Sequence, residues 1–107
     1  MKRGEVRWYT FKAPDKRRPV VILTRNASIG VLTSLTIAPI TSTIRDVPSE
    51  VMLDEHDGLL KACAVNLHSI QTVPKNNLGV LITTLLQERM NKIEEALRFA
   101  LGFEELV

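Results

Sequence analysis

The sequence predicts a mainly β protein with one C-terminal helix, and two observations support this prediction. Short apolar segments rich in β-forming residues recur about every ten residues through most of the chain. Near the C-terminus the apolar residues change to the spacing of one helix face, at Leu86, Met90, Ile93, Leu97 and Leu101. Short strands at this interval are typical of a small antiparallel barrel, so we expect the helix to cover one side or end of it.

Three strands are expected in the N-terminal part of the chain, at residues 4–11, 19–24 and 31–41. The second is a continuous β-branched run, which is typical of a buried strand. Pro39 cannot donate to a ladder, so the end of the third strand should be an edge or a bulge. Residues 12–17 read as a short turn, and residues 25–30 as a connection that includes a helical turn.

The rest of the chain is expected to hold a loop, three more strands and the helix. These are the loop 43–49, a short strand 50–53, a turn at His56-Asp57-Gly58, a long strand 62–73 stopped by Pro74, a last short strand 79–82 and the helix 85–101. Thr84 and Gln87 fit a capping box at the helix start. Gly102 is a natural stop just beyond its end.

Composition places the chain among ordinary globular proteins. Its 107 residues, 45% hydrophobic and 24% charged, fit a single domain over residues 1–107. No apolar run is long enough to span a membrane and no signal-peptide pattern opens the chain, so we expect a cytoplasmic protein. Cys63 is the only cysteine and should be a buried thiol. One cysteine and two separated histidines give no metal-ligand spacing, so no metal or cofactor is expected.

Charge is divided unevenly along the chain. Residues 1–45 hold nine basic and two acidic residues, a net charge of +7, whereas residues 46–107 hold five basic and ten acidic residues, a net charge of −5. A basic half indicates a surface that binds phosphates. Strands that simply expose solvated basic residues would give the same count, so charge alone leaves both interpretations open.

Two strand ends carry the residues that favour the first interpretation. The segment Arg17-Arg18-Pro19 begins a strand with two guanidiniums. The third strand ends in three hydroxyls and a further guanidinium, at Thr41, Ser42, Thr43 and Arg45. Hydroxyl donors beside permanently charged guanidiniums suit a phosphodiester, so these segments point to nucleic acid as the ligand.

Five segments in this order resemble the MazF/PemK toxin family of endoribonucleases. They are residues 3–8 (Arg-Gly-Glu-Val-Arg-Trp), 17–23, 38–45, 73–79 and 93–102. The resemblance implies an SH3-like barrel with helices, a homodimer, and a toxin that cleaves single-stranded RNA, usually mRNA, at a short sequence without a metal ion. It also implies a cognate antitoxin, expected to be acidic, that covers the RNA site.

By the same resemblance, Arg18 and Thr41 occupy the two catalytic positions. The candidate RNA-binding residues are Lys16, Arg17, Ser42, Thr43, Arg45 and Gln71. The chain departs from the family in its short 12–17 loop and in the segment 68–71, where Gln71 stands in place of a charged residue. We therefore do not transfer the family's RNA sequence preference to this chain.

RNA can be cut without a metal because its own 2′-OH is a nucleophile. Arg18 is suited to stabilise the negative charge that develops on the phosphoryl oxygens, and Thr41 is suited to donate a hydrogen bond to a non-bridging oxygen. His68 has the unperturbed pKa of an acid–base catalyst, although in a strand it is more often a partly buried structural residue. Trp8 and Tyr9 could stack on bases, but core or dimer packing is favoured for Trp8.

Two other classes of function remain as alternatives. A gyrase-poisoning toxin of the CcdB type has a related fold, but its action depends on a C-terminal Trp-Gly-Ile, whereas this chain ends Phe-Glu-Glu-Leu-Val. A non-catalytic SH3-like binding module would not need guanidinium and hydroxyl groups that converge between two strands. Cleavage of RNA by the purified protein separates both from a nuclease.

Overall fold

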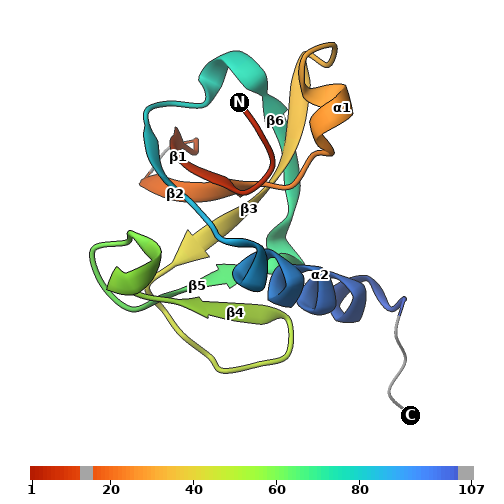
Figure 1. The fold of residues 1–107 in the computed structure, drawn as a ribbon. Coiled ribbons are helices and arrows are strands. Elements are labelled where there is room, and N and C mark those ends of the chain that lie inside the picture. The colour runs from red at the N-terminus through yellow and green to blue at the C-terminus, as the bar shows by residue number, and fades with distance from the viewer. Residues whose placement is uncertain (13–15, 104–107) are drawn as a thin grey trace.

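The computed structural model describes residues 1–12 and 16–103. Along them the chain forms seven strands, two α-helices and three single 3₁₀ turns (Figure 1). The strands are β1 (Glu5–Thr10), β2 (Arg17–Ile22), β3 (Ser34–Thr41), β4 (Glu50–Leu53), β5 (Cys63–Asn66), β6 (Gln71–Pro74) and β7 (Leu81–Thr84). The helices are α1 (Asn26–Ile29) and α2 (Gln87–Leu101), and the turns are η1 (Glu55–Asp57), η2 (Leu67–Ser69) and η3 (Lys75–Asn77).

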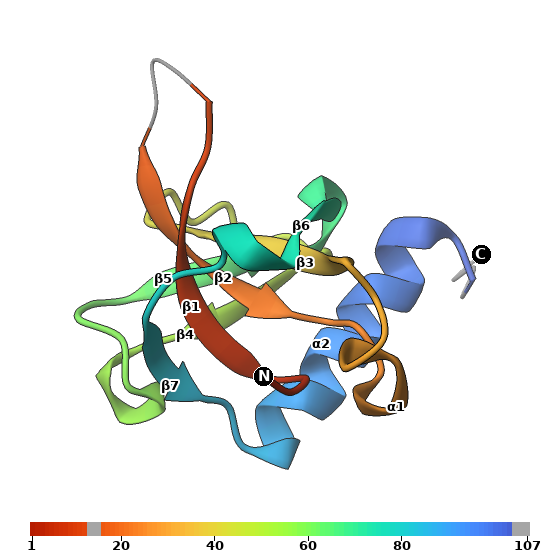
Figure 2. The same ribbon diagram turned by 90° about the horizontal axis from the view of Figure 1, so that it is seen from above.

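All strand pairs are antiparallel, in the order β4-β5-β3-β2-β1-β7, with β6 also paired to β3. The sheet curls into a half-barrel, and α2 lies along one side of it, where it contacts η2 and β4 (Figures 1 and 2). This confirms the predicted class, a small antiparallel barrel with one C-terminal helix. Within the described residues, neither helix is long and apolar enough to cross a bilayer.

Strand β3 is the centre of the sheet because it pairs with three other strands, β2, β5 and β6. One edge pairs with β2, and the other pairs with β6 at Ser34–Ile37 and with β5 at Ile40 and Thr41. Pro39 lies where the second edge passes from β6 to β5 and has no partner there. A residue without an N–H fits such an interruption, whereas the sequence predicted an edge or a bulge at this end of the strand.

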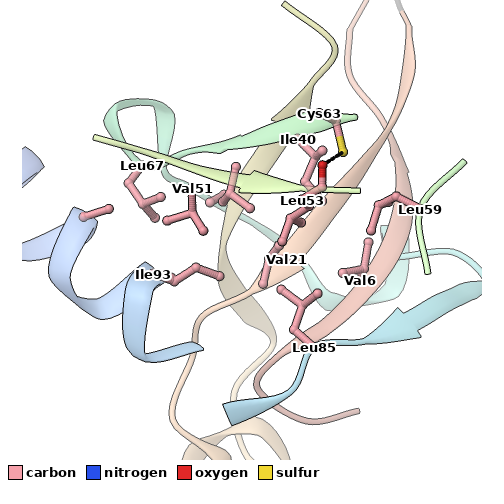
Figure 3. Packing of buried hydrophobic residues seen from close by; sticks show 13 residues of the cluster. Val6, Val21, Ile40, Val51, Leu53, Leu59, Cys63, Leu67, Leu85 and Ile93 are labelled. Atoms are coloured by element: carbon pink, nitrogen blue, oxygen red, sulfur yellow. Dashed lines mark hydrogen bonds between the residues drawn. The ribbon is translucent and has the colours of Figure 1, made fainter. Parts of the chain in front are cut away.

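Two clusters of buried residues form the core, one on each face of β2. Val21 packs with Val6, Ile40 and Leu53 in the cluster that α2 covers through Ile93 (Figure 3). Val20 and Ile22 point the other way, into a cluster with Leu35, Ile37 and Val73. Burial on both faces explains why the sequence of β2 is a continuous β-branched run instead of an alternating one.

The predicted long strand 62–73 is wrong, because η2 interrupts it. The side chain of Asn66 accepts a hydrogen bond of 3.0 Å from the backbone N–H of His68, which stabilises a turn at this point. Leu67 is buried within that turn. The chain then continues as β6 along the same edge of β3. The apolar pattern of the sequence therefore runs through the turn without interruption and gives no sign of it.

The helix starts later than predicted and lacks the expected capping box. Thr84 belongs to β7, where it pairs with Glu5, so the residue that precedes α2 is Leu86, which has no capping side chain. Sheet pairing has therefore overridden a local capping signal. At the other end Gly102 adopts φ 77° and caps the helix as predicted.

Candidate nucleic-acid site

The candidate site lies where β2 and β3 separate. Their pairing ends at Val20 and Pro39. Arg18 and Thr41 each lie two residues beyond that pair, so their side chains leave the sheet on the same face. Beyond this point β2 stays paired with β1, whereas Thr41 pairs with β5, and the two strand ends diverge. Arg18 and Thr41 therefore lie at the two sides of an opening between the strand ends.

A pocket of about 390 Å³ occupies this opening. Six of the predicted site residues line it: Lys16, Arg17, Arg18, Thr41, Ser42 and Thr43. The other lining residues are Trp8, Pro19, Ile40, Leu59, Leu60, Lys61, Cys63 and Ile82. The sequence hypothesis that the ends of these two strands form one site therefore agrees with their positions in space.

The pocket is strongly cationic. Lys16, Arg17, Arg18 and Lys61 line it, and no carboxylate does so among the described residues. Arg18 is half-buried and Arg17 is exposed. Like charges that share a concave, partly apolar site repel one another and attract anions, so the pocket is suited to a polyanion.

Thr41 is oriented by the bend at the end of β3. Its Oγ1 accepts a hydrogen bond of 3.1 Å from the backbone N–H of Thr43. A hydroxyl has one proton and two acceptor sites, so this bond fixes the oxygen and leaves the proton available to a ligand. Thr41 is thus a preoriented donor at the pocket wall.

Cys63 also lines the pocket, but its environment keeps the thiol protonated. Burial raises its pKa, and the negative charges of Asp57 and Asp54 raise it further. Its Sγ donates a weak hydrogen bond of 3.8 Å to the carbonyl oxygen of Leu53 (Figure 3). The predicted buried, structural thiol is confirmed.

Trp8 and Arg17 lie in contact at the pocket. Trp8 pairs with Pro19 across β1 and β2, and Arg17 is two residues before Pro19 on the same face. The guanidinium carbon of Arg17 lies 4.3 Å from the centre of the Trp8 ring, the geometry of a cation–π contact. The sequence favoured core or dimer packing for Trp8, yet the indole is half-buried and reaches the pocket.

Three predicted site residues lie outside the pocket lining. Arg45 is exposed in the loop after β3, where its backbone N–H donates to Glu50 at 2.9 Å. Gln71 is exposed on β6, where it pairs with Ile37. His68 is exposed in η2, so its expected place as a partly buried strand residue is wrong.

The sequence missed the wall formed by residues 59–61, because no pattern links this loop to the strand ends. Gly58 precedes the loop with φ 96°, and a Cβ there would lie 2.5 Å from Oγ1 of Thr83. Gly58 is therefore required both for its left-handed backbone and for the close approach of β7. The turn signal His56-Asp57-Gly58 located the bend but not the pocket that it helps to form.

The same turn is held to α2 by an ion pair, a contact that we call the η1–α2 joint. Asp57 accepts a hydrogen bond of 2.9 Å from Nε of Arg89, and its side chain also accepts from the backbone N–H of Asp54. Burial alone would raise the pKa of Asp57, but the bonds from Arg89 and Asp54 and the positive charge of Arg89 outweigh it and lower that pKa. Arg89 is not among the regularly spaced apolar residues of the helix, and that spacing alone would place its side chain in solvent.

Among residues 1–12 and 16–103, no three His, Cys, Asp or Glu side chains gather where they could share a metal ion.

The fold and the cationic pocket agree with the comparisons with known proteins. Residues 2–101 match the family described as PemK-like, MazF-like toxin of type II toxin–antitoxin system. The chain belongs to this family, which confirms the resemblance found in the sequence.

Mycobacterial proteins are among its relatives. The chain is 39% identical over 93 residues to endoribonuclease MazF3 of Mycobacterium tuberculosis, covering 87% of this chain and 90% of the relative. It is 41% identical over 99 residues to probable endoribonuclease MazF5 of the same organism, covering 92% and 90%.

Solved structures of similar fold also include toxins and endoribonucleases of this kind. M. tuberculosis toxin MazF-mt6 superposes with a TM-score of 0.86 at 34% identity, covering 94% of this chain and 99% of that one. A mycobacterial endoribonuclease in complex with its cognate antitoxin gives 0.85 at 30% identity, covering 98% of both chains.

Proposed function

We propose that this chain is a MazF-type endoribonuclease toxin that cleaves single-stranded RNA, mRNA above all, at a short sequence in the pocket between β2 and β3. The observation that supports this most is the placement of Arg18 and Thr41 at the diverging strand ends, inside a pocket with four cationic side chains. Family membership and relatives named endoribonuclease support the same conclusion.

In the proposed reaction, the 2′-OH of one nucleotide attacks the adjacent phosphorus in line and expels the 5′-oxygen of the next nucleotide. The 2′-oxygen loses its proton and the departing oxygen gains one, so the products are a 2′,3′-cyclic phosphate and a 5′-OH. Negative charge accumulates on the non-bridging oxygens between these events. A site that stabilises that charge lowers the barrier without a metal ion.

Arg18 is assigned this stabilisation, because its planar guanidinium can donate two parallel hydrogen bonds to phosphoryl oxygens. Thr41 donates its free hydroxyl proton to a non-bridging oxygen. We assign the contacts with flanking phosphates to Lys16, Arg17, Ser42 and Thr43 in the pocket. Arg45 and Gln71 would contact RNA beyond the pocket, and exposed His68 is given no step in the reaction.

An acidic antitoxin is the proposed inhibitor, since a polyanionic peptide would compete with RNA for the same cations. A solved relative of this chain is described in complex with its cognate antitoxin. We also propose that the toxin acts as a homodimer and in the cytoplasm, where mRNA is found. Sedimentation that shows only a 12.0 kDa species at micromolar concentration would contradict the dimer.

The test is cleavage of a long single-stranded RNA by purified protein in excess EDTA, with the new 5′ ends mapped. A second substrate replaces the 2′-OH at one mapped site with hydrogen. We expect cutting in EDTA, 5′-OH ends, and no cutting at the substituted position although binding persists. A strict Mg²⁺ requirement, or cutting at the 2′-deoxy position, would contradict the mechanism. If the RNA is not cut at all, the protein would instead be a gyrase-poisoning toxin or a non-catalytic binding module.

A further inference from the structure

Arg17 and Trp8 are in contact at the lining of the pocket. A flat guanidinium lies over the face of a flat indole, with 4.3 Å from its carbon to the ring centre. The indole is half-buried, so the sheet does not cover it completely, and Arg17 itself is exposed. An exposed arginine side chain can leave such a contact easily, because a cation–π contact at an exposed site is weak.

The surroundings of the indole are suited to a flat heterocycle. Ile40, Leu59 and Ile82 contribute apolar surface to the pocket wall, and Lys16 and Lys61 contribute positive charge. A nucleotide has the matching division, since its base is flat and largely apolar on both faces and its phosphate is anionic. The pocket volume of about 390 Å³ is within the range of small-ligand sites.

We propose that Trp8 is a base-stacking residue: a base of the bound RNA takes the place of the Arg17 guanidinium over the indole. Arg17 then turns outward and contacts a phosphate next to that base. This inference rests on the proposed function, because it assigns a subsite beside Arg18 and Thr41 in the same pocket. It predicts that substitution of Trp8 weakens binding of the base and substitution of Arg17 weakens binding of the phosphate, each without loss of the other.

Trp8 is the only tryptophan in the chain, so its fluorescence reports on this site alone. The first probe is a random-sequence hexanucleotide of 2′-O-methyl RNA. Its 2′-oxygens are methylated and cannot act as nucleophiles, so the probe is not cleaved. The second is a hexamer of abasic residues, which carries the same phosphates and no bases. We expect the first probe to quench Trp8 emission as it binds, and the second to bind more weakly and leave the emission unchanged.

Variants separate the two contacts. Trp8→Leu should bind the base-bearing hexamer about tenfold more weakly, as loss of one stacked base does, with abasic binding unchanged. Trp8→Phe retains a ring and should recover part of that loss. Arg17→Ala should keep the quenching, because the stacking place is then vacant. The slope of the logarithm of its binding constant against the logarithm of the salt concentration should become shallower by about 0.7, the value for one phosphate contact with a single strand.

Tyr9→Leu is the matched control. Tyr9 is the next aromatic residue on β1, pairs with Arg18, packs edge-on against Phe11 at 4.8 Å and does not line the pocket. Circular dichroism of each variant checks that the fold is kept. We expect Tyr9→Leu to quench and bind like the unaltered protein.

The outcomes distinguish this inference from the proposed function. Equal binding of both hexamers with unchanged emission would overturn the stacking role and leave the nuclease intact. Loss of quenching in Arg17→Ala would overturn the exchange of guanidinium for base. If neither hexamer binds at low salt, both the stacking role and the proposed RNA site are wrong.

Discussion

The pocket and the η1–α2 joint are both built with charged side chains, but they treat charge in opposite ways. In the joint, Asp57 and Arg89 satisfy one another at 2.9 Å, and both side chains are largely buried. In the pocket, four cationic side chains converge without a carboxylate among the described lining residues. Paired opposite charges therefore indicate a contact that stabilises the fold, whereas like charges without partners indicate a ligand-binding surface.

The two regions are also neighbours in the chain. The joint fixes Asp57, and the pocket wall of residues 59–61 follows immediately after Gly58. The joint thus directly precedes, in the chain, a wall of the cationic pocket. The contrast predicts that changes in the pocket affect catalysis and not stability, and that changes in the joint do the reverse.

The largest expected effect is that of Arg18→Ala on cleavage. Removal of one preorganised group that stabilises transition-state charge typically costs about 10²-fold or more, and we expect that loss in the single-turnover rate. Arg18→Lys should not recover much activity, since an ammonium cannot reproduce the planar fork. Near-normal cleavage by Arg18→Ala, with its circular dichroism unchanged, would show that the active site lies elsewhere.

Thr41→Val should cost less, about tenfold to a hundredfold in the same assay, because it removes a single neutral donor. Valine keeps the shape and β-branching of threonine, so strand pairing should persist. Ser42→Ala is a comparison within the same pocket, where we expect a smaller loss from a flanking contact. A Thr41→Val enzyme as active as the unaltered one would remove the hydroxyl from the mechanism.

Asp57→Asn tests the joint, and its main effect should appear in stability. Loss of a charged hydrogen bond in a largely buried pair should lower the free energy of unfolding by about 2 kcal/mol. Glu94→Gln is the matched control, because its pair with Arg98 at 3.2 Å is exposed and should contribute no more than about 0.5 kcal/mol. Urea unfolding of both variants measures the difference, and equal values would break the contrast drawn above.

The pH dependence of stability sharpens the same test. The pKa of Asp57 is lower in the folded chain than its ordinary value, so the unfolded chain binds a proton more readily. The contribution of Asp57 is therefore complete above the unfolded pKa of about 4 and is lost as pH falls through the lowered folded pKa. Asp57→Asn should flatten the acid side of the stability profile, and an unchanged profile would argue against the pair.

The smallest effect is expected for Arg45→Ala, which lies outside the pocket lining. Loss of one phosphate contact should weaken RNA binding modestly and make the log–log salt slope shallower by about 0.7, while bound RNA is cut at the normal rate. Binding titrations at several salt concentrations, followed by single-turnover cleavage, separate the two quantities. A large fall in the cleavage rate of bound RNA would place Arg45 in the reaction instead.

Much of the fold could be predicted from sequence because its strands carry their own signals. The run around Val20 and Val21 marks a strand buried on both faces, and the change of apolar spacing marks α2. The family resemblance, and not a local pattern, assigned Arg18 and Thr41 to one site, and the pairing of β2 with β3 places both residues at the same pocket.

What could not be predicted depends on contacts between distant segments. Thr84 carries a capping signal, yet it is used in pairing with Glu5. Arg89 reads as a solvent-facing helix residue, yet its partner Asp57 is 32 positions away. Lys61 and Trp8 reach the pocket from a loop and from β1, and no local pattern records where those segments meet.

The pairing of β1 with β7 also determines when the pocket can form. Trp8 of β1 and Ile82 of β7 line the same pocket, so one of its walls is absent until almost the whole chain can fold. Contacts between residues so far apart in sequence form late and slowly compared with local ones. During synthesis, the growing chain should therefore remain unable to cut RNA until its last strand has left the ribosome, which delays the threat that a toxin poses to the cell making it.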